Sequence, residues 1–262
     1  MARFVRLVIL STACLLAGCA ASQGRLGWRV KDLVFSPRAT VSLQSADERV
    51  LLTLPTKTVQ QLMLAHLRIS RSANIQTELF IVEGDQPNAF AGIERDQRII
   101  GINLGMVKLI GDDVNEYAAL IGHEAAHWAK GHVDSSRLRA NTLNALGTLV
   151  SAGLGMAGVP AAGALTHLGI ELIDATYSRD QEREADAQSI EYLAANGYEP
   201  RAAIRLHEKM LKVDYGFRPP FLSSHPSSEE RIASLKALIE QNEAKRRSAA
   251  PSASQTDSSE RK

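Results

Sequence analysis

Two histidines and a glutamate, spaced so that a helix would bring them together, are the residues of this sequence best suited to chemistry. His123 and His127 are four residues apart, and Glu124 directly follows the first histidine. Residues four apart share one face of a helix, so both imidazoles can reach one metal ion. Glu124 is then placed to take a proton from a water molecule beside that metal. The H-E-x-x-H spacing is typical of zinc-dependent peptidases.

The residues before this motif predict a helix that carries it. Asp113 and Glu116 have the spacing of an N-terminal capping box, and Gly131 is a suitable C-terminal stop. A catalytic zinc site needs a third protein ligand. His132 is the nearest candidate, but it lies nine residues after His123, whereas the metzincin pattern requires ten. We therefore expect His132 to be a solvent-facing histidine.

A second candidate for the third ligand is a group of acidic residues further along the chain. Glu182 and Asp186 are four residues apart and would share one helix face, with Glu184 offset by two positions. A glutamate from a second, crossing helix would complete a site of two histidines and one carboxylate. Taken alone, the alternating charges of this segment are better explained by a solvated helix face.

Together these motifs resemble the M48 family of gluzincin peptidases. The resemblance covers roughly Pro55 to Leu238 and rests on H-E-x-x-H, S-R-x-x-E-x-x-A-D at 178–186, Asn196–Tyr198, His225–Pro226 with Arg231, and Asn88–Phe90. It implies that Glu182 is the third ligand of one zinc ion per chain. It also implies that Asp186 orients a ligating histidine and that Glu184 points away from the metal.

The resemblance also implies roles for His225 and Arg231, which are six residues apart. His225 would approach the zinc site, either to polarise the oxyanion or to occupy the open metal position. Arg231 would pair with an acidic residue behind the ligands. Without the resemblance, His225 would be taken as an exposed residue in a loop before a helix. The peptide substrate is expected to pair as an extended strand with residues 98–103.

The predicted fold that positions these residues is α+β and mostly helical. The resemblance implies a zincin-like peptidase domain with a small sheet whose edge strand lies beside the active-site helix. Sequence patterns predict the following elements: possible short strands within 28–53, a helix from 56, β-runs at 79–82 and 98–103, a turn at 88–92, and helices at about 170–196, 201–214 and 227–238.

The N-terminus predicts export and a lipid anchor. Leu16-Ala17-Gly18-Cys19 resembles the lipobox of bacterial lipoproteins, in which the cysteine carries the lipid; a plain signal peptide is the alternative. Ala20, in place of Asp, favours the outer membrane, facing the periplasm. The predicted divisions are a signal peptide (1–18), a tether and N-terminal segment (19–54), the peptidase domain (55–243) and a disordered polar tail (244–262).

The composition narrows the range of functions. A formal net charge of +1 gives no reason to expect a nucleic-acid partner. Residues 140–170 carry no Asp, Glu, Lys or Arg and are rich in Ala, Gly and Leu, which suits core packing, a mobile cover or membrane contact. We expect an ATP-independent zinc endopeptidase that degrades misfolded or misassembled envelope proteins. The alternatives are a periplasmic chaperone for outer-membrane proteins with conditional proteolysis and, less favoured, an integral membrane protease.

Overall fold

The computed structural model is an α+β fold that is mostly helical, as expected, and it describes residues 27–139, 170–171, 177–213, 225 and 229–249. Its elements in chain order are β1 (Trp28–Arg29), α1 (Val30–Leu33), β2 (Thr40–Gln44), β3 (Val50–Pro55), α2 (Thr56–Ala73), β4 (Glu78–Val82), β5 (Ala89–Glu94), β6 (Gln97–Asn103), α3 (Leu104–Ile110), α4 (Val114–Ala129), β7 (Ile170–Glu171), α6 (Arg179–Ala195), α7 (Ala202–Lys212) and α9 (Glu229–Ala249). Residues 132–139 are also helical.

A five-stranded mixed sheet lies beside the helices, in the order β1-β4-β6-β5-β7. Strands β4 and β6 are parallel, whereas β5 is antiparallel to both β6 and β7. The contact of β5 with β7 involves only Ile93 and Glu94, so the first part of β5 has a strand partner on one side only among the described residues. A separate hairpin joins β2 and β3.

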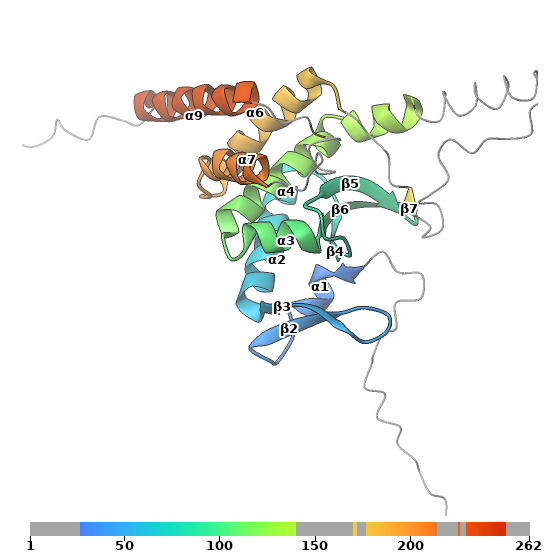
Figure 1. Ribbon diagram of the computed structural model, residues 1–262. Coiled ribbons are helices and arrows are strands. Elements are labelled where there is room, and N and C mark those ends of the chain that lie inside the picture. Colours follow the sequence, from blue (N-terminus) through green and yellow to red (C-terminus); the bar gives the residue numbers. More distant parts are fainter. Residues whose placement is uncertain (1–26, 140–169, 172–176, 214–224, 226–228, 250–262) are drawn as a thin grey trace, which may run out of the picture.

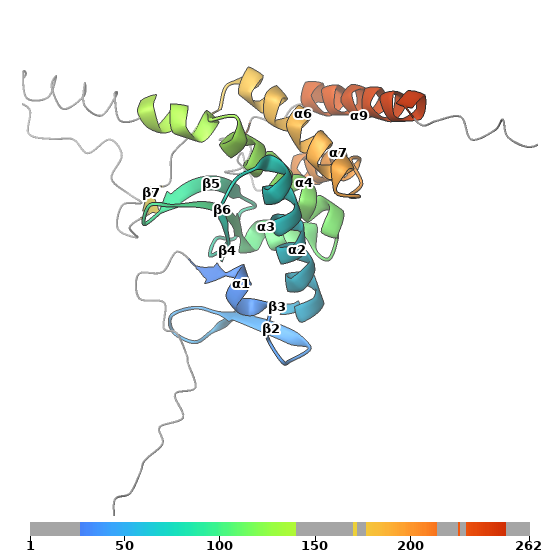
Figure 2. The same ribbon diagram turned by 180° about the vertical axis from the view of Figure 1, so that it is seen from behind.

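The helices form the other layer, with α4 at its centre. Helix α4 packs against α2, α6 and α7, and its sheet-facing side contacts β5. Figures 1 and 2 show the hairpin of β2 and β3 at the opposite end of the molecule from α9. The main hydrophobic core contains buried residues from α2, the sheet, α4, α6 and α7. The functional motif therefore lies on the most enclosed helix of the fold.

Several predicted elements are confirmed. Helix α2 begins at Thr56, and it buries Val59, Leu62 and His66 at helical spacing. It ends at Ala73, and the following residue, Asn74, is its C-cap with a left-handed φ of 52°. Strands β4 and β6 coincide with the predicted runs at 79–82 and 98–103.

Three predicted elements differ from the structure. Residues 88–92 are not a turn: Ala89–Glu94 is strand β5, paired along its length with β6. The helix expected from Ile170 begins only at Arg179, because Ser178 and Gln181 form a capping box there, and Ile170–Glu171 is a strand. The last helix continues to Ala249, so residues 244–249 are helical and not part of a disordered tail.

The arrangement of strands also corrects the expected position of a substrate. Strand β6, which contains residues 98–103, pairs with β4 on one side and β5 on the other, so its backbone is not free to receive another strand. The edge beside α4 belongs to β5. Sequence alone identified a strand near the site but could not give its neighbours.

Three predictions lie wholly or partly outside the described residues. These are the signal peptide and lipobox, including Cys19, the apolar segment 140–169, and the polar tail from residue 250 onward. Among the helices of the described ranges, none combines the length and apolar character needed to cross a membrane.

Candidate metal centre

Helix α4 is fixed at both ends, and this holds the H-E-x-x-H residues in place. At its start, the Asp113 carboxylate accepts hydrogen bonds from the backbone N–H groups of Asn115 and Glu116. The Glu116 side chain does not complete the predicted capping box; it lies 2.7 Å from Lys209 Nζ of α7 instead. Near the other end, Trp128 donates a hydrogen bond to the Ile99 carbonyl of β6, at 3.1 Å.

The absence of a side chain at Gly122 allows α6 to approach α4. A Cβ atom at Gly122 would lie 2.7 Å from Ser189 Oγ of α6, which is too close for two heavy atoms. Ser189 in turn donates a hydrogen bond to the Ala119 carbonyl of α4. Glycine inside a helix usually costs about 1 kcal/mol relative to alanine, so its position one residue before the motif was a signal that sequence reasoning missed.

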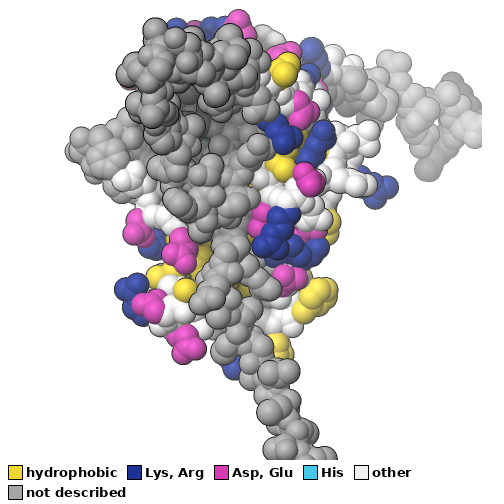
Figure 3. Space-filling model, turned by 90° about the vertical axis from the view of Figure 1, so that its right-hand side faces the viewer, with side chains coloured by type: hydrophobic (Ala, Val, Ile, Leu, Met, Phe, Trp, Pro, Cys, Tyr) yellow, Lys and Arg dark blue, Asp and Glu magenta, His cyan; other side chains and the backbone are white. Residues whose placement is uncertain are grey.

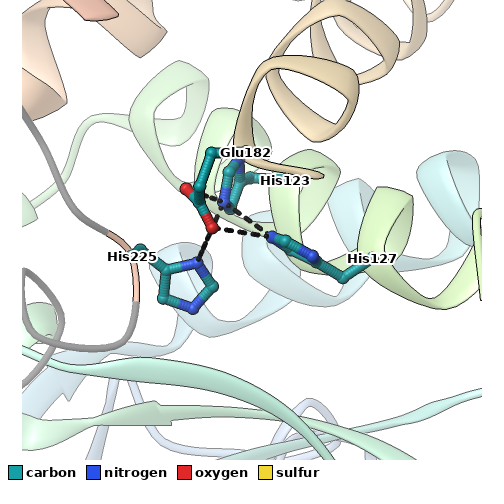
Figure 4. Close-up of side chains that lie close together, drawn as sticks. All are labelled: His123, His127, Glu182 and His225. Carbon is teal, nitrogen blue, oxygen red and sulfur yellow. Dashed lines mark hydrogen bonds and ion pairs between the residues drawn. The ribbon is translucent and has the colours of Figure 1, made fainter. Parts of the chain in front are cut away.

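The close approach of α4 and α6 gathers four buried side chains, and their ligand atoms all lie within 4.8 Å of one another. They are His123, His127, Glu182 and His225. Figure 4 shows the two imidazoles of α4, the Glu182 carboxylate from α6 and His225 converging on one point. The structure thus brings together all three residues predicted as zinc ligands and the histidine predicted to approach them.

The separations within this cluster fit a tetrahedral ion. His123 Nε2 lies 3.1 Å from His127 Nε2 and 3.4 Å from Glu182 Oε2, and His127 Nε2 lies 3.4 Å from Glu182 Oε1. Ligand atoms bonded to one tetrahedral zinc at about 2.0–2.1 Å are separated by about 3.3 Å. His225 Nδ1 lies 3.2 Å from His123 Nε2 and 2.9 Å from Glu182 Oε1, a position suited to a fourth ligand. The donor set of imidazoles and carboxylate is one that zinc favours.

The charges around the cluster favour an ionised Glu182. Burial alone would raise the pKa of Glu182, but the charge of His123 and the hydrogen bonds from the surrounding histidines hold that pKa well below its usual range. Burial also disfavours the charged form of His123 and so, by itself, would lower its pKa. There the charge of Glu182 and the hydrogen bond to Asp186 outweigh burial and raise the pKa of His123 to about 9. Without a metal ion, a proton on His123 therefore compensates the carboxylate.

A buried ion pair lies directly behind His123. Asp186 Oδ1 is 3.0 Å from His123 Nδ1, and Arg231 donates to both Asp186 oxygens at 2.6 and 2.7 Å. Arg231 also forms an ion pair with Glu182. Asp186 and Arg231 thus occupy the positions that the resemblance implied for them, one against a histidine and one against buried carboxylates. Their roles in zinc binding stay predictions.

Glu124 is fully buried, and among the described residues neither of its carboxylate oxygens has a hydrogen-bond partner. His225 Nε2 lies 3.6 Å from Glu124 Oε1. Burial raises the pKa of Glu124, although the charges of His225 and His123 oppose that shift. A buried carboxylate with a raised pKa and unsatisfied oxygens is suited to accept a proton.

One aromatic residue at this site differs from expectation, and a second was not anticipated. His132 is not solvent-facing: it is buried, with Nδ1 3.1 Å from His127 Nδ1 and Nε2 3.1 Å from Glu184 Oε2. Tyr177, which sequence reasoning did not single out, stacks on His127 with ring centroids 3.7 Å apart. His132 and Glu184 are not among the four clustered ligands, so neither replaces Glu182.

The outer surface contrasts with this buried site. Figure 3 shows one face of the molecule, on which basic and acidic side chains of the described residues lie next to one another. No histidine of the described chain is visible there, and His123, the most exposed member of the cluster, is only 6% exposed. The four side chains of the cluster are therefore internal.

Comparison with known proteins agrees with this geometry. Metalloprotease LoiP of Escherichia coli is 32% identical to this chain, over 57% of each protein. Metalloprotease YcaL of the same organism is 30% identical over 52% of each. The beta-barrel assembly-enhancing protease of E. coli is 28% identical over 64% of this chain and 36% of its own length. The aligned region spans about half of the first two relatives and about a third of the third.

A model of Peptidase family M48 matches residues 53–239, which include every residue of the cluster. The match covers most of the chain and nearly the whole segment predicted as the peptidase domain. The chain therefore belongs to peptidase family M48.

Proposed function

We propose that this protein is a zinc-dependent endopeptidase. The observation that carries the proposal is the buried cluster of His123, His127 and Glu182, spaced as corners of a tetrahedron, with the buried carboxylate of Glu124 beside it. Two imidazoles and one carboxylate leave a fourth position for water or substrate, which is the arrangement of a catalytic zinc site. Membership of family M48 supports the same chemistry.

Zinc held by these three side chains would lower the pKa of a bound water toward about 7 and would polarise the scissile carbonyl. Glu124 accepts a proton as the water oxygen attacks the carbonyl carbon. It then delivers that proton to the amide nitrogen as the C–N bond breaks, so the proton count balances. Burial of Glu124 supports this role, because its raised pKa makes the carboxylate a stronger base.

His225 supplies the fourth corner of the cluster, which suggests a resting state closed to substrate. With four protein donors in place, no open position is left for catalysis. His225 belongs to the segment before α9, while the other three donors lie on α4 and α6. Withdrawal of His225 alone would therefore open the site without disturbing the helices that hold the remaining ligands.

The substrate backbone is proposed to pair with the outer edge of β5. Residues 89–92 have a strand partner on one side only within the described part of the sheet, and β5 packs against α4. Addition of a strand uses backbone hydrogen bonds, which tolerate many side chains. Such binding suits extended segments of polypeptides that have not folded.

The proposed physiological role is quality control of envelope proteins at the outer membrane, facing the periplasm. Support comes from the lipobox-like sequence ending in Cys19 and from the name of one relative, the beta-barrel assembly-enhancing protease. Replacement of Cys19 by Ser should abolish incorporation of labelled palmitate and release the protein from the membrane fraction. Unchanged lipid labelling in that variant would contradict the proposed anchor.

The enzymatic proposal is tested by Glu124→Gln. We expect hydrolysis of unfolded casein to fall by about 10²–10⁴-fold, the usual contribution of a general base, while bound zinc stays at one ion per chain. Asp180→Asn, an exposed change at the start of α6, is the control and should retain full activity. Wild-type hydrolysis by Glu124→Gln with zinc bound would exclude the mechanism.

A chaperone with conditional proteolysis is the second candidate, and the position of His225 favours it. A site closed by a fourth donor could bind a client without cleaving it. In a strain that lacks the protein and is under envelope stress, restoration of growth by Glu124→Gln would support chaperone activity. Failure of that variant, with success of Asp180→Asn, would support proteolysis as the required activity.

A further inference from the structure

The side of His127 that faces away from the cluster has a defined partner. His127 Nε2 lies within the cluster, whereas its Nδ1 is 3.1 Å from His132 Nδ1. His132 Nε2 is in turn 3.1 Å from Glu184 Oε2. His132 is 5% exposed, and the Glu184 side chain is 60% exposed. The contacts form a chain from the buried cluster to the surface.

The direction of the hydrogen bonds in this chain follows from the role of His127. If Nε2 of His127 binds zinc, that nitrogen carries no proton, so the neutral ring has its proton on Nδ1. His127 Nδ1–H must then donate to His132 Nδ1. Neutral His132 consequently carries its own proton on Nε2 and donates it to the Glu184 carboxylate. One arrangement of protons satisfies all three groups.

We propose that His132 and Glu184 are positioning residues for zinc binding by His127. They select the ring tautomer that leaves Nε2 free and hold the imidazole in its plane, as hydrogen-bonded partners of metal-ligating histidines do. This inference rests on the proposed zinc site and extends it. It gives a positioning role to two residues that do not bind the metal, the buried His132 and the exposed Glu184.

The ring of Tyr177 completes the support of His127 from a different direction. The two rings are 3.7 Å apart with an angle of 25° between their planes, so Tyr177 covers a face of the imidazole. His132 contacts the edge of the same ring through Nδ1. Stacking limits tilting of His127, whereas the hydrogen bond limits rotation within the plane, so the two contacts are not redundant.

The experiment measures zinc affinity by competition with a chromophoric chelator. We expect His132→Phe, which keeps a ring but loses both nitrogens, to bind zinc about 10–100-fold more weakly. His132→Asn, which keeps an acceptor near the Nδ1 position, should recover part of that loss. Glu184→Ala should weaken binding several-fold, while Glu191→Ala, an exposed change on the same helix, should match the wild type.

A second readout examines the tautomer directly. Long-range ¹H–¹⁵N correlation spectra of the zinc-loaded wild type should show His132 protonated on Nε2 and not on Nδ1. Protonation on Nδ1 would overturn the inference. So would a Glu184→Ala affinity equal to that of Glu191→Ala; this comparison decides the matter even if His132→Phe does not fold. A wild-type protein that binds no zinc would instead refute the proposed function.

Discussion

The two histidines of α4 lie one helical turn apart but in environments of opposite character. Behind His123 are full charges, Asp186 and Arg231. Behind His127 are the imidazole of His132 and the ring of Tyr177. The pKa of His123 is raised to about 9, because the charge of Glu182 and the hydrogen bond to Asp186 outweigh burial. The pKa of His127 is instead lowered well below its ordinary value by burial, together with the charge of His123.

This difference shows that one chemical requirement is met by two physical means. Both histidines must present an unprotonated Nε2 to bind zinc through that atom. On the His123 side, an ionic group accepts the Nδ1 proton; on the His127 side, a neutral ring accepts it and an aromatic face restricts the orientation. The first side should therefore be sensitive to loss of charge, and the second to loss of shape and hydrogen bonding.

The largest effect is expected on the charged side, from Asp186→Ala. The change leaves Arg231 buried without one of its two carboxylate partners. Breaking a buried ion pair in this way should reduce the free energy of unfolding by about 3–5 kcal/mol, measured by urea denaturation of the metal-free protein. Asp180→Ala, which removes an exposed carboxylate from the same helix, is the control. Equal stability of the two variants would contradict the idea that buried charges support His123 while neutral rings support His127.

A somewhat smaller effect on the free energy of unfolding is expected when the pH of the metal-free protein is changed. Because folding raises the pKa of His123 from 6.5 to about 9, its contribution is fully present below pH 6.5 and is lost as pH rises through 9; the loss is on the order of 3 kcal/mol. His127 has a lowered pKa, so its contribution is present above pH 6.5 and is lost as pH falls.

Urea denaturation at a series of pH values checks whether the two histidines have opposite effects on stability. His123→Gln should flatten the alkaline limb of the stability profile, and His127→Gln should flatten part of the acid limb. Burial also lowers the pKa of His66 to about 4 and that of His207 to about 3, so these two residues should maintain some acid dependence in the His127→Gln variant. Identical profiles for the two glutamine variants would contradict the assignment of opposite shifts.

The smallest effect is expected from Tyr177, on the neutral side. Tyr177→Leu removes an aromatic stack worth about 1 kcal/mol, which corresponds to a loss of zinc affinity of about fivefold. Tyr177→Phe keeps the stack and should bind zinc as the wild type does, in the same chelator competition. Equal weakening by both changes would mean that the hydroxyl, and not the stacked ring, supports His127.

The parts of this site that sequence could predict are those fixed by local spacing. The cap at Asp113 and the four-residue spacing of His123 and His127 depend only on one helix, and the structure contains that helix. The resemblance to M48 peptidases named Glu182 and His225, and both lie in the cluster. Spacing alone did not show whether Glu182 is a metal ligand or a charged residue on a solvated helix face.

What sequence did not predict depends on contacts between distant segments. Asn88–Gly92 has the composition of a turn, and only pairing with β6 makes it part of a strand. His132 follows the end of α4, and it is buried because Glu184 and His127 lie beside it. The role of Gly122 becomes visible only once Ser189 of α6 lies against it. Each of these features depends on where α6 or the sheet packs.

The distribution of the cluster along the chain has a consequence for biosynthesis. His225 lies 102 residues beyond His123, with Glu182 between them. At about 5–20 residues per second, a ribosome takes roughly 5–20 s to add that intervening length. The motif helix is therefore made well before its partners from α6 and the α9 region. Until Glu182 is added, 59 residues after His123, the nascent chain has only two of the clustered ligands and cannot complete the proposed three-ligand site.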